Sequence, residues 1–339
     1  MRRVMRVATI PTALCMLMLV VIAGPAGATF PGKNGRIAFS LDTDSGTQIN
    51  TIRPNGQDLQ QITSLTENAL GSDWSPDGTK IVFEFDASGD DFGYGCRIEM
   101  MNADGSDIVD LTPKSWVAKD GCAYNPSFTP DGKRIVFVAT RCRDEIACPR
   151  TLWSMNLQGR NRRRIIHIWN IGSFDMHSPR VSPDGRWILF TVVDETVVVN
   201  GVHGNRKALY MVRPNGTHLT QVVPYRLDVC VCGGDWAPNQ HKIVSSSQAG
   251  PTPVPGNASN LFTVRPDGTH LHYLTHSRNT DVSTGVGSYS PNGRWITYKR
   301  ATASGQYRLM RIHPSGRGRS LIARLHANFY SRDWGSRPS

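Results

Sequence analysis

One ten-residue stretch decides the fold: Trp74-Ser75-Pro76-Asp77-Gly78-Thr79-Lys80-Ile81-Val82-Phe83. It joins an aromatic residue to a Pro-Asp-Gly turn, a basic residue and a β-rich run. Further copies of this first unit begin at Phe128, Val181, Trp236 and Tyr289, and the copy at Trp236 is degraded to Ala-Pro-Asn-Gln. The copies are roughly 50 to 55 residues apart, a period that is typical of β-propeller blades.

A second unit alternates with the first and consists of a β-rich run that ends in a glycine-containing turn. Its six turns fall at residues 54–56, 103–105, 157–159, 214–216, 266–268 and 314–316. Asn-Gly and Asp-Gly tolerate the positive φ that hairpin turns need, so each copy predicts two antiparallel strands. Two units in each repeat therefore predict four strands per blade.

The two ends of the chain each carry half of a first unit. Residues 32–39 match its back half, and Ser331-Arg332-Asp333-Trp334-Gly335 matches its front half. Pairing of these halves in one sheet closes a ring and removes two exposed strand edges. The sequence thus predicts an all-β fold, a six-bladed β-propeller of four-stranded antiparallel blades that is closed by pairing of the N- and C-terminal strands.

This arrangement also assigns the two faces of the ring. Each innermost strand runs toward its Pro-Asp-Gly turn and the next strand returns. The repeat turns are therefore expected on one face, the turn face, and the variable connections on the other, the variable face.

Residues 1–28 have the features of a signal peptide, and residues 29–339 are assigned to the propeller. A basic start (Arg2, Arg3 and Arg6) precedes an apolar stretch from Ile10 to Ile22, and small residues suited to cleavage follow at 26–28. No later segment is apolar enough to cross a membrane. Export to the periplasm, the cell envelope or the medium is therefore expected.

Six cysteines follow the signal peptide, all in or beside the variable connections: Cys96, Cys122, Cys142, Cys148, Cys230 and Cys232. An even number in an exported protein predicts disulfides, and no pair has the Cys-x-x-Cys spacing of a zinc site. Cys142 and Cys148 flank one hairpin loop and are the first expected pair. A second bridge, from Cys96 to Cys122, would tie neighbouring blades.

The formal charge of +11 includes three arginines and no acid in the signal peptide, which leaves +8 for the rest of the chain. A basic surface can attract anionic polymers, phospholipid headgroups or nucleic acid. No RNA- or DNA-binding motif accompanies these cations, so no nucleic-acid partner is expected.

The repeated Trp-Ser-Pro-Asp-Gly-Thr-Lys-Ile-Val-Phe, followed by an apolar strand and Ala-Asp-Gly-Ser, resembles the repeat of the TolB-like β-propeller family. The resemblance covers essentially the whole chain after residue 28. It implies an exported, six-bladed, non-catalytic protein that recruits partners in the cell envelope. Similar propellers precede the hydrolase domain of prolyl oligopeptidases, but no Gly-x-Ser-x-Gly elbow occurs in this sequence.

Three carboxylates immediately precede repeat tryptophans on innermost strands: Asp73, Asp235 and Asp333. A carboxylate ring in the central channel could hold a metal, and the alternative function is therefore a propeller enzyme of the lactonase or lyase type. Ser127, Arg180 and Ser288 take the equivalent places in other blades, and an arginine among three acids makes a poor oxygen cage. Hydrogen bonding to backbone is the expected role, and no cofactor is expected.

Aromatic residues outside the repeat register lie in the connections that lead into successive inner strands on the variable face. These are Trp116, Trp169 and Tyr225, with Asp175, His177 and Asp228 nearby. Exposed aromatic and polar residues at a channel mouth can bind a protein, a peptide or a glycan. Alternatively, the loops bury these aromatics as plugs. The sequence favours a non-enzymatic interaction platform over an enzyme and leaves the oligomeric state open.

Overall fold

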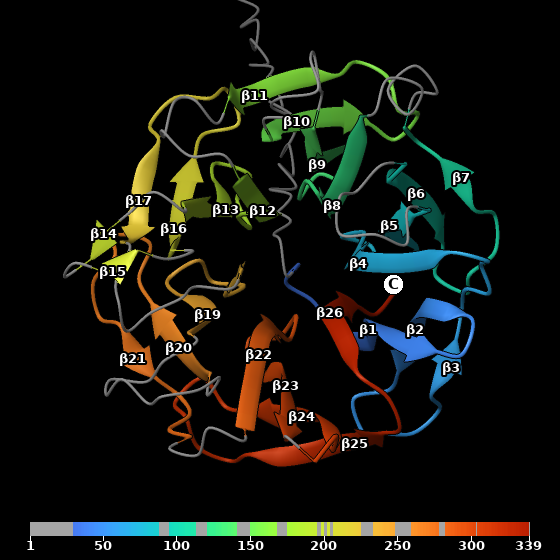
Figure 1. Ribbon diagram of the computed structural model, residues 1–339, viewed down its shortest axis with the longest axis vertical. Helices are drawn as coiled ribbons and strands as arrows, with labels where there is room; N and C mark the ends of the chain where they lie inside the picture. The colour runs from blue at the N-terminus through green and yellow to red at the C-terminus, as the bar shows by residue number, and fades with distance from the viewer. Residues whose placement is uncertain are drawn as a thin grey trace, which may run out of the picture.

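The computed structural model describes residues 30–87, 95–112, 121–140, 150–167, 175–194, 198–199, 202–203, 206–224, 233–247, 259–277, 282–302 and 304–338. Six four-stranded antiparallel sheets stand around a common centre (Figure 1). The predicted six-bladed propeller is therefore confirmed. No helix in the described part of the chain has the length and hydrophobicity needed to cross a membrane.

Each blade extends from an innermost strand near the centre to an outermost strand at the rim. In this order, blade 1 has β26 (Phe329–Ser336), β1 (Asn34–Thr43), β2 (Gly46–Ile52) and β3 (Gln60–Gln61). Blade 2 has β4 (Asn68–Trp74), β5 (Lys80–Asp86), β6 (Arg97–Asn102) and β7 (Val109–Asp110). Blade 3 has β8 (Cys122–Phe128), β9 (Arg134–Thr140), β10 (Arg150–Asn156) and β11 (Arg163–His167).

Blade 4 has β12 (Asp175–Val181), β13 (Ile188–Asp194), β16 (Arg206–Val212) and β17 (Thr220–Val223). Blade 5 has β18 (Gly234–Trp236), β19 (Ile243–Ser247), β20 (Asn260–Val264) and β21 (His272–Tyr273). Blade 6 has β22 (Val282–Tyr289), β23 (Ile296–Thr302), β24 (Tyr307–Ile312) and β25 (Ser320–Leu325). A short ribbon, β14 (Val198–Val199) and β15 (Val202–His203), lies in the connection between β13 and β16.

The first and last strands of the described chain pair and close the ring. β1 and β26 are antiparallel, with Ile37 opposite Trp334 and Ala38 opposite Asp333. Just beyond the pair, Arg337 N donates to Lys33 O at 2.8 Å, where the other blades have a first-unit turn. The two half-units at the ends of the sequence therefore form one blade, as predicted.

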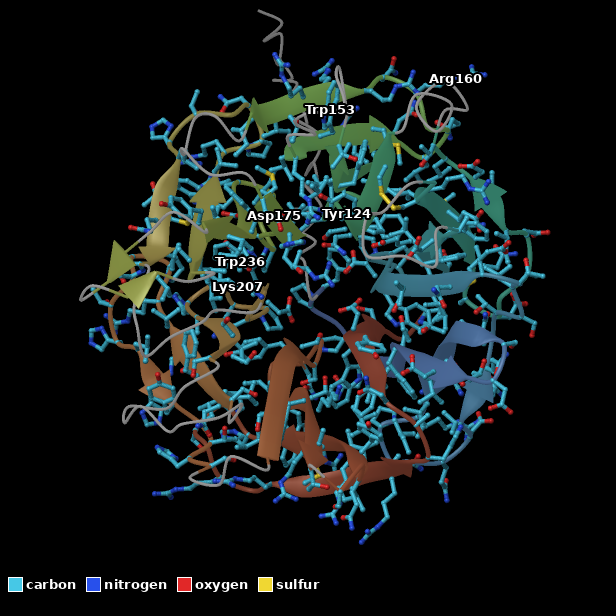
Figure 2. The ribbon with its side chains drawn as sticks, in the orientation of Figure 1. Tyr124, Trp153, Arg160, Asp175, Lys207 and Trp236 are labelled. Atoms are coloured by element: carbon cyan, nitrogen blue, oxygen red, sulfur yellow. A yellow bond between two sulfur atoms is a disulfide. The ribbon has the colours of Figure 1, made fainter. Side chains whose placement is uncertain are left out.

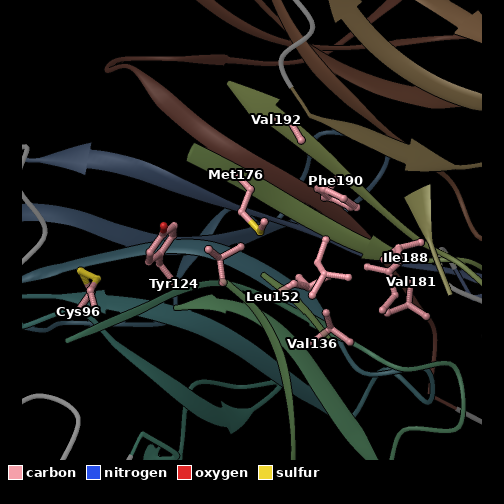
Figure 3. Packing of buried hydrophobic residues seen from close by; sticks show 13 residues of the cluster. Cys96, Tyr124, Val136, Leu152, Met176, Val181, Ile188, Phe190 and Val192 are labelled. Carbon is pink, nitrogen blue, oxygen red and sulfur yellow. A yellow bond between two sulfur atoms is a disulfide. The ribbon is translucent and has the colours of Figure 1, made fainter. Parts of the chain in front are cut away.

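Hydrophobic side chains fill the spaces between adjacent blades. Figure 3 shows one cluster, in which Val136 and Leu152 of blade 3 pack with Val181, Ile188 and Phe190 of blade 4. The repeat aromatics are buried in such clusters, as expected from their place on innermost strands: Trp74, Phe128, Trp236, Tyr289 and Trp334. Large rings suit these sites because each one buries much apolar surface between two sheets.

The repeat turns crowd the turn face because strands one and three of each blade run toward it. A Cβ atom added at Gly105 would lie 2.1 Å from the carbonyl oxygen of Ile62 in the preceding blade, so this second-unit turn needs glycine. First-unit turns also meet their neighbours, and Gly293 lies against Pro238. In the degraded copy, Gln240 takes the glycine position with a φ of 63°.

Candidate functional site

The innermost strands bring a group of polar residues to the propeller axis. This axis cluster consists of Asp73, Ser127, Arg180, Asp235 and Asp333. Phe30, Trp74, Trp334 and Gly335 complete the lining of the cavity between them, which has a volume of only about 10 Å³. Such a cavity holds a single water molecule at most.

Four of the side chains that precede a repeat aromatic bind the backbone of the next blade. Each of these four accepts a hydrogen bond from the N–H of the repeat aromatic of that blade. The bonds run from Trp74 N to Asp333 Oδ2 (2.9 Å), from Phe128 N to Asp73 Oδ2 (2.7 Å), from Tyr289 N to Asp235 Oδ2 (2.8 Å) and from Trp334 N to Ser288 Oγ (3.2 Å). The three carboxylates thus join adjacent innermost strands.

The electrostatics of the axis cluster also oppose a metal cage. Arg180 Nη1 lies 3.7 Å from Asp73 Oδ1 and occupies the cavity wall with the three acids. Burial raises the pKa of Asp73 to about 7, although Arg180 opposes the shift, and burial also raises the pKa of Asp333. In the described ranges, no group of three His, Cys, Asp or Glu residues is arranged to hold a metal. The side chains of the axis cluster therefore suit hydrogen bonds between blades better than the coordination of a metal ion.

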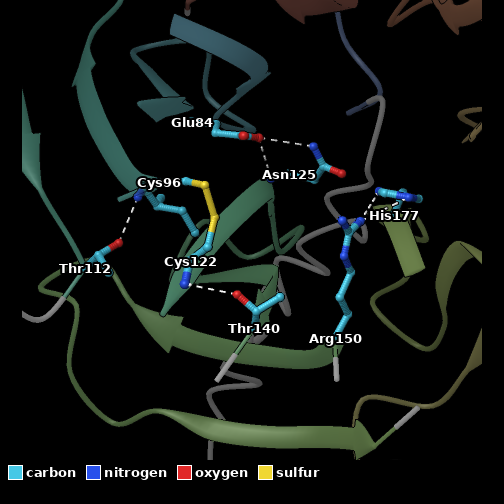
Figure 4. Close-up of a disulfide and its surroundings, with 9 residues drawn as sticks. Glu84, Cys96, Thr112, Cys122, Asn125, Thr140, Arg150 and His177 are labelled. Carbon is cyan, nitrogen blue, oxygen red and sulfur yellow. Dashed lines mark hydrogen bonds between the residues drawn. A yellow bond between two sulfur atoms is a disulfide. The ribbon is translucent and has the colours of Figure 1, made fainter. Parts of the chain in front are cut away.

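A second set of bonds links blades 2, 3 and 4 nearer the variable face. Asn125 and Ser178 have φ values of 49° and 51°, and the register of their strands shifts at these bulges. Glu84 Oε2 accepts from Asn125 N (3.1 Å) and Nδ2 (3.2 Å; Figure 4). Asn125 Oδ1 in turn accepts from Ser178 N at 3.0 Å. Burial raises the pKa of Glu84 to about 7.

Beside these bonds lies the variable-face cluster, formed by Tyr124, Arg150, Asp175 and His177. Arg150 forms an ion pair with Asp175, whose Oδ2 lies 2.7 Å from His177 Nε2. The Arg150 guanidinium stands 4.9 Å over the Tyr124 ring. Figure 2 places Tyr124 and Asp175 near the centre of the ring. The side chains of Arg150, Asp175 and His177 remain 28% to 34% exposed, so the cluster can meet a ligand from solvent.

A disulfide anchors this region. Cys96 and Cys122 are bonded, as predicted, and join the start of the third strand of blade 2 to the innermost strand of blade 3 (Figure 4). Ala123 N also donates to Cys96 O at 3.1 Å. Because Tyr124 is two residues from Cys122, the bridge fixes the strand that carries it.

Of the predicted binding residues, the structure brings Asp175 and His177 together. The remaining ones, Trp116, Trp169, Tyr225 and Asp228, lie outside the described residues, as does the expected pair Cys142 and Cys148. Sequence reasoning missed Arg150 and Tyr124. The repeat gave no signal for Arg150, because the matching position in blade 2, six residues before Asn102, is Cys96.

The sequence profile described as the TolB beta propeller domain matches residues 22–195, slightly more than half of the chain. Two similar solved structures are TolB from Acinetobacter baumannii (18% identity, TM-score 0.65, 89% of this chain and 67% of that one) and putative TolB from Agrobacterium tumefaciens (14%, 0.61, 86% and 90%). An oligogalacturonate lyase in complex with manganese also shares the fold (14%, 0.57, 88% and 81%). No curated protein matches the sequence.

Proposed function

The chain belongs to the TolB β-propeller family, and from this premise we propose that it is an exported, non-enzymatic interaction protein. It binds a protein, peptide or glycan through its variable face, in the cell envelope or outside the cell. The variable-face cluster forms part of the binding surface.

One observation carries this proposal: the two polar groups near the axis differ in accessibility. The carboxylates of the axis cluster are buried and hold the backbone of neighbouring blades. Arg150, Asp175 and His177 instead keep about a third of their side-chain surface in solvent. Polar groups held in place beside an aromatic ring are what a specific binding surface requires.

The chemistry of the cluster suits a neutral polar ligand. Arg150 and Asp175 form an ion pair, so their charges largely cancel, while the guanidinium donates and the carboxylate accepts hydrogen bonds. Sugar hydroxyls and peptide amides present both donors and acceptors at such spacing. Trp116, Trp169, Tyr225 and Asp228 are proposed to extend the surface, since the sequence predicts that their connections lie on the same face.

Two features support export. The basic and apolar segments of residues 1–28 have the pattern of a cleaved signal peptide. The Cys96–Cys122 disulfide fits an oxidising compartment such as the periplasm or the medium.

Glycan arrays and pull-downs with the purified protein test the proposal. We expect Arg150→Gln to weaken the interaction they detect by about tenfold or more, because it removes a charge-assisted donor. Trp116→Ala and Trp169→Ala are expected to weaken it as well. Arg160→Gln is the matched control, since Arg160 is exposed in a turn at the outer rim (Figure 2). If every detected interaction survived these three substitutions, binding through this face would be refuted.

A further inference from the structure

A separate pocket opens on the turn face, between the first-unit turns of blades 5 and 6. Its volume is about 610 Å³, within the range of small-molecule sites. Four prolines supply much of the wall: Pro31, Pro238, Pro291 and Pro314. This turn-face pocket is on the opposite side of the propeller from the variable-face cluster, so it is independent of the function proposed above.

The polar groups of the pocket are cationic or neutral. Lys242 and His241 line it, and no acidic residue does. Tyr289 also lines it, but its hydroxyl is buried and not open to the pocket. The charged or polar donors that the pocket offers to a ligand are therefore those of Lys242 and His241.

Comparison among the repeats shows why Lys242 is unusual. The same repeat position holds Lys80 in blade 2, whose Nζ donates to Asn102 Oδ1 at 2.6 Å. In blade 3 it holds Arg134, which donates to Ser154 Oγ at 2.9 Å. No such hydrogen bond or ion pair is found for the Lys242 ammonium among the described residues.

Blade 1 shows what blade 5 is missing. There Arg36 and Arg53 both pair with Asp58, at 2.7 and 3.1 Å. Asp58 stands two residues after the glycine of the second-unit turn, with a φ of 56°. The equivalent residue in blade 5 is His270, with a φ of 55°. A histidine therefore stands in blade 5 where blade 1 has the carboxylate that neutralises Arg36.

We propose that the turn-face pocket binds a small organic anion, in which a carboxylate or phosphate group is attached to an apolar body. Lys242 and His241 hold the anionic group, because an ammonium and an imidazole are good donors to its oxygens. The prolines contact the apolar body. The anion neutralises Lys242, as Asp58 neutralises Arg36 in blade 1.

The test uses benzoate and phenyl phosphate as probes, with benzyl alcohol as the neutral control, titrated into the purified protein by calorimetry or ligand-observed NMR. We expect at least one anion to bind, and benzyl alcohol to bind at least about tenfold more weakly, since it lacks the charge-assisted contacts. The two anions distinguish a carboxylate site from a phosphate site.

Two variants locate the binding. Lys242→Gln is expected to raise the Kd of the anion by about tenfold or more, whereas Lys80→Gln, the matched repeat position, leaves it unchanged. His270→Asp keeps Lys242 but supplies the missing carboxylate, so it is expected to weaken binding comparably. Thermal unfolding confirms that each variant is folded. Binding of neither anion, equal binding of benzyl alcohol, or an unchanged Kd in both Lys242→Gln and His270→Asp would overturn the proposal.

Discussion

The carboxylate of Asp333, on the last strand of the chain, accepts a hydrogen bond from the backbone N–H of Trp74, 259 residues earlier. β26 itself pairs with β1, so the same strand closes blade 1 through its backbone and joins blade 2 through this side chain. Asp73 and Asp235 make the same kind of bond to the next blade. The residues that most resemble a metal site are thus part of how the ring is held together.

Removing one of these acceptors should destabilise the protein. Asp333→Ala leaves the buried Trp74 N–H without its partner, and we expect a loss of about 1–3 kcal/mol in the free energy of unfolding. Urea denaturation measures it, with Asp44→Ala as the control because Asp44 is exposed. Equal stability of Asp333→Ala and wild type would show that the bond contributes nothing.

The buried carboxyl of Asp73 should make stability depend on pH. Burial raises its pKa from 3.8 to about 7, so between about pH 4 and 7 the folded protein retains a proton that the unfolded chain has released. Stability contributed by the protonated group is therefore lost as the pH rises through this window. Asp73→Asn keeps an oxygen for Phe128 N but cannot ionise, and its melting temperature should vary less between pH 4 and 8. If melting temperature varied with pH equally in wild type and Asp73→Asn, the Asp73 carboxyl would not contribute to the pH dependence.

Replacing Gln240 by glycine should stabilise the protein. It adopts a φ of 63° at a place where the other first-unit turns have glycine. Gln240→Gly removes the strain of the left-handed conformation. We expect the free energy of unfolding to rise by about 0.5–1 kcal/mol, after allowing for the greater entropy of a glycine in the unfolded chain. The control is Gln158→Gly, an exposed turn residue outside the positive-φ set, which should gain nothing. A loss of stability in Gln240→Gly would show that Gln240 is not strained at this position.

The Cys96–Cys122 disulfide should support both stability and binding. It closes a segment of 26 residues, and the Cys96→Ser/Cys122→Ser variant is expected to lose about 2–4 kcal/mol. The variable-face interaction should weaken too, because the bridge fixes the strand that carries Tyr124. Chemical denaturation and the pull-down assay measure the two effects. Unchanged behaviour in both assays would mean that neighbouring contacts hold this strand without the bridge.

The fold was predictable because the information was repeated. Five first units and six second units fixed the number of blades, and the half-units at residues 32–39 and 331–335 fixed the closing pair. The structural role of Asp73 was also foreseeable, since Arg180 takes the equivalent place in another blade. That each acceptor binds the next blade's aromatic N–H could be seen only in the structure, because the bond depends on how neighbouring sheets pack.

The variable-face cluster was only half predictable. Asp175 and His177 stood out in the sequence, but Arg150 belongs to another blade and reaches them across the space between two sheets. Its position depends on strand register and on the bulges at Asn125 and Ser178, which are set by the pairing of whole strands. The turn-face pocket was not predictable from the sequence for a similar reason. Lys242 stands out only when its lack of a partner among the described residues is compared with the hydrogen bond of Lys80 and the ion pair of Arg36.

The most direct test of the central claim is the metal content of the purified protein, measured by elemental analysis together with unfolding in the presence and absence of EDTA. If the axial aspartates serve as hydrogen-bond acceptors between blades, the protein should contain no stoichiometric metal and EDTA should not change its melting temperature. One tightly held ion per chain, lost in Asp235→Asn, would contradict this account and favour the enzyme.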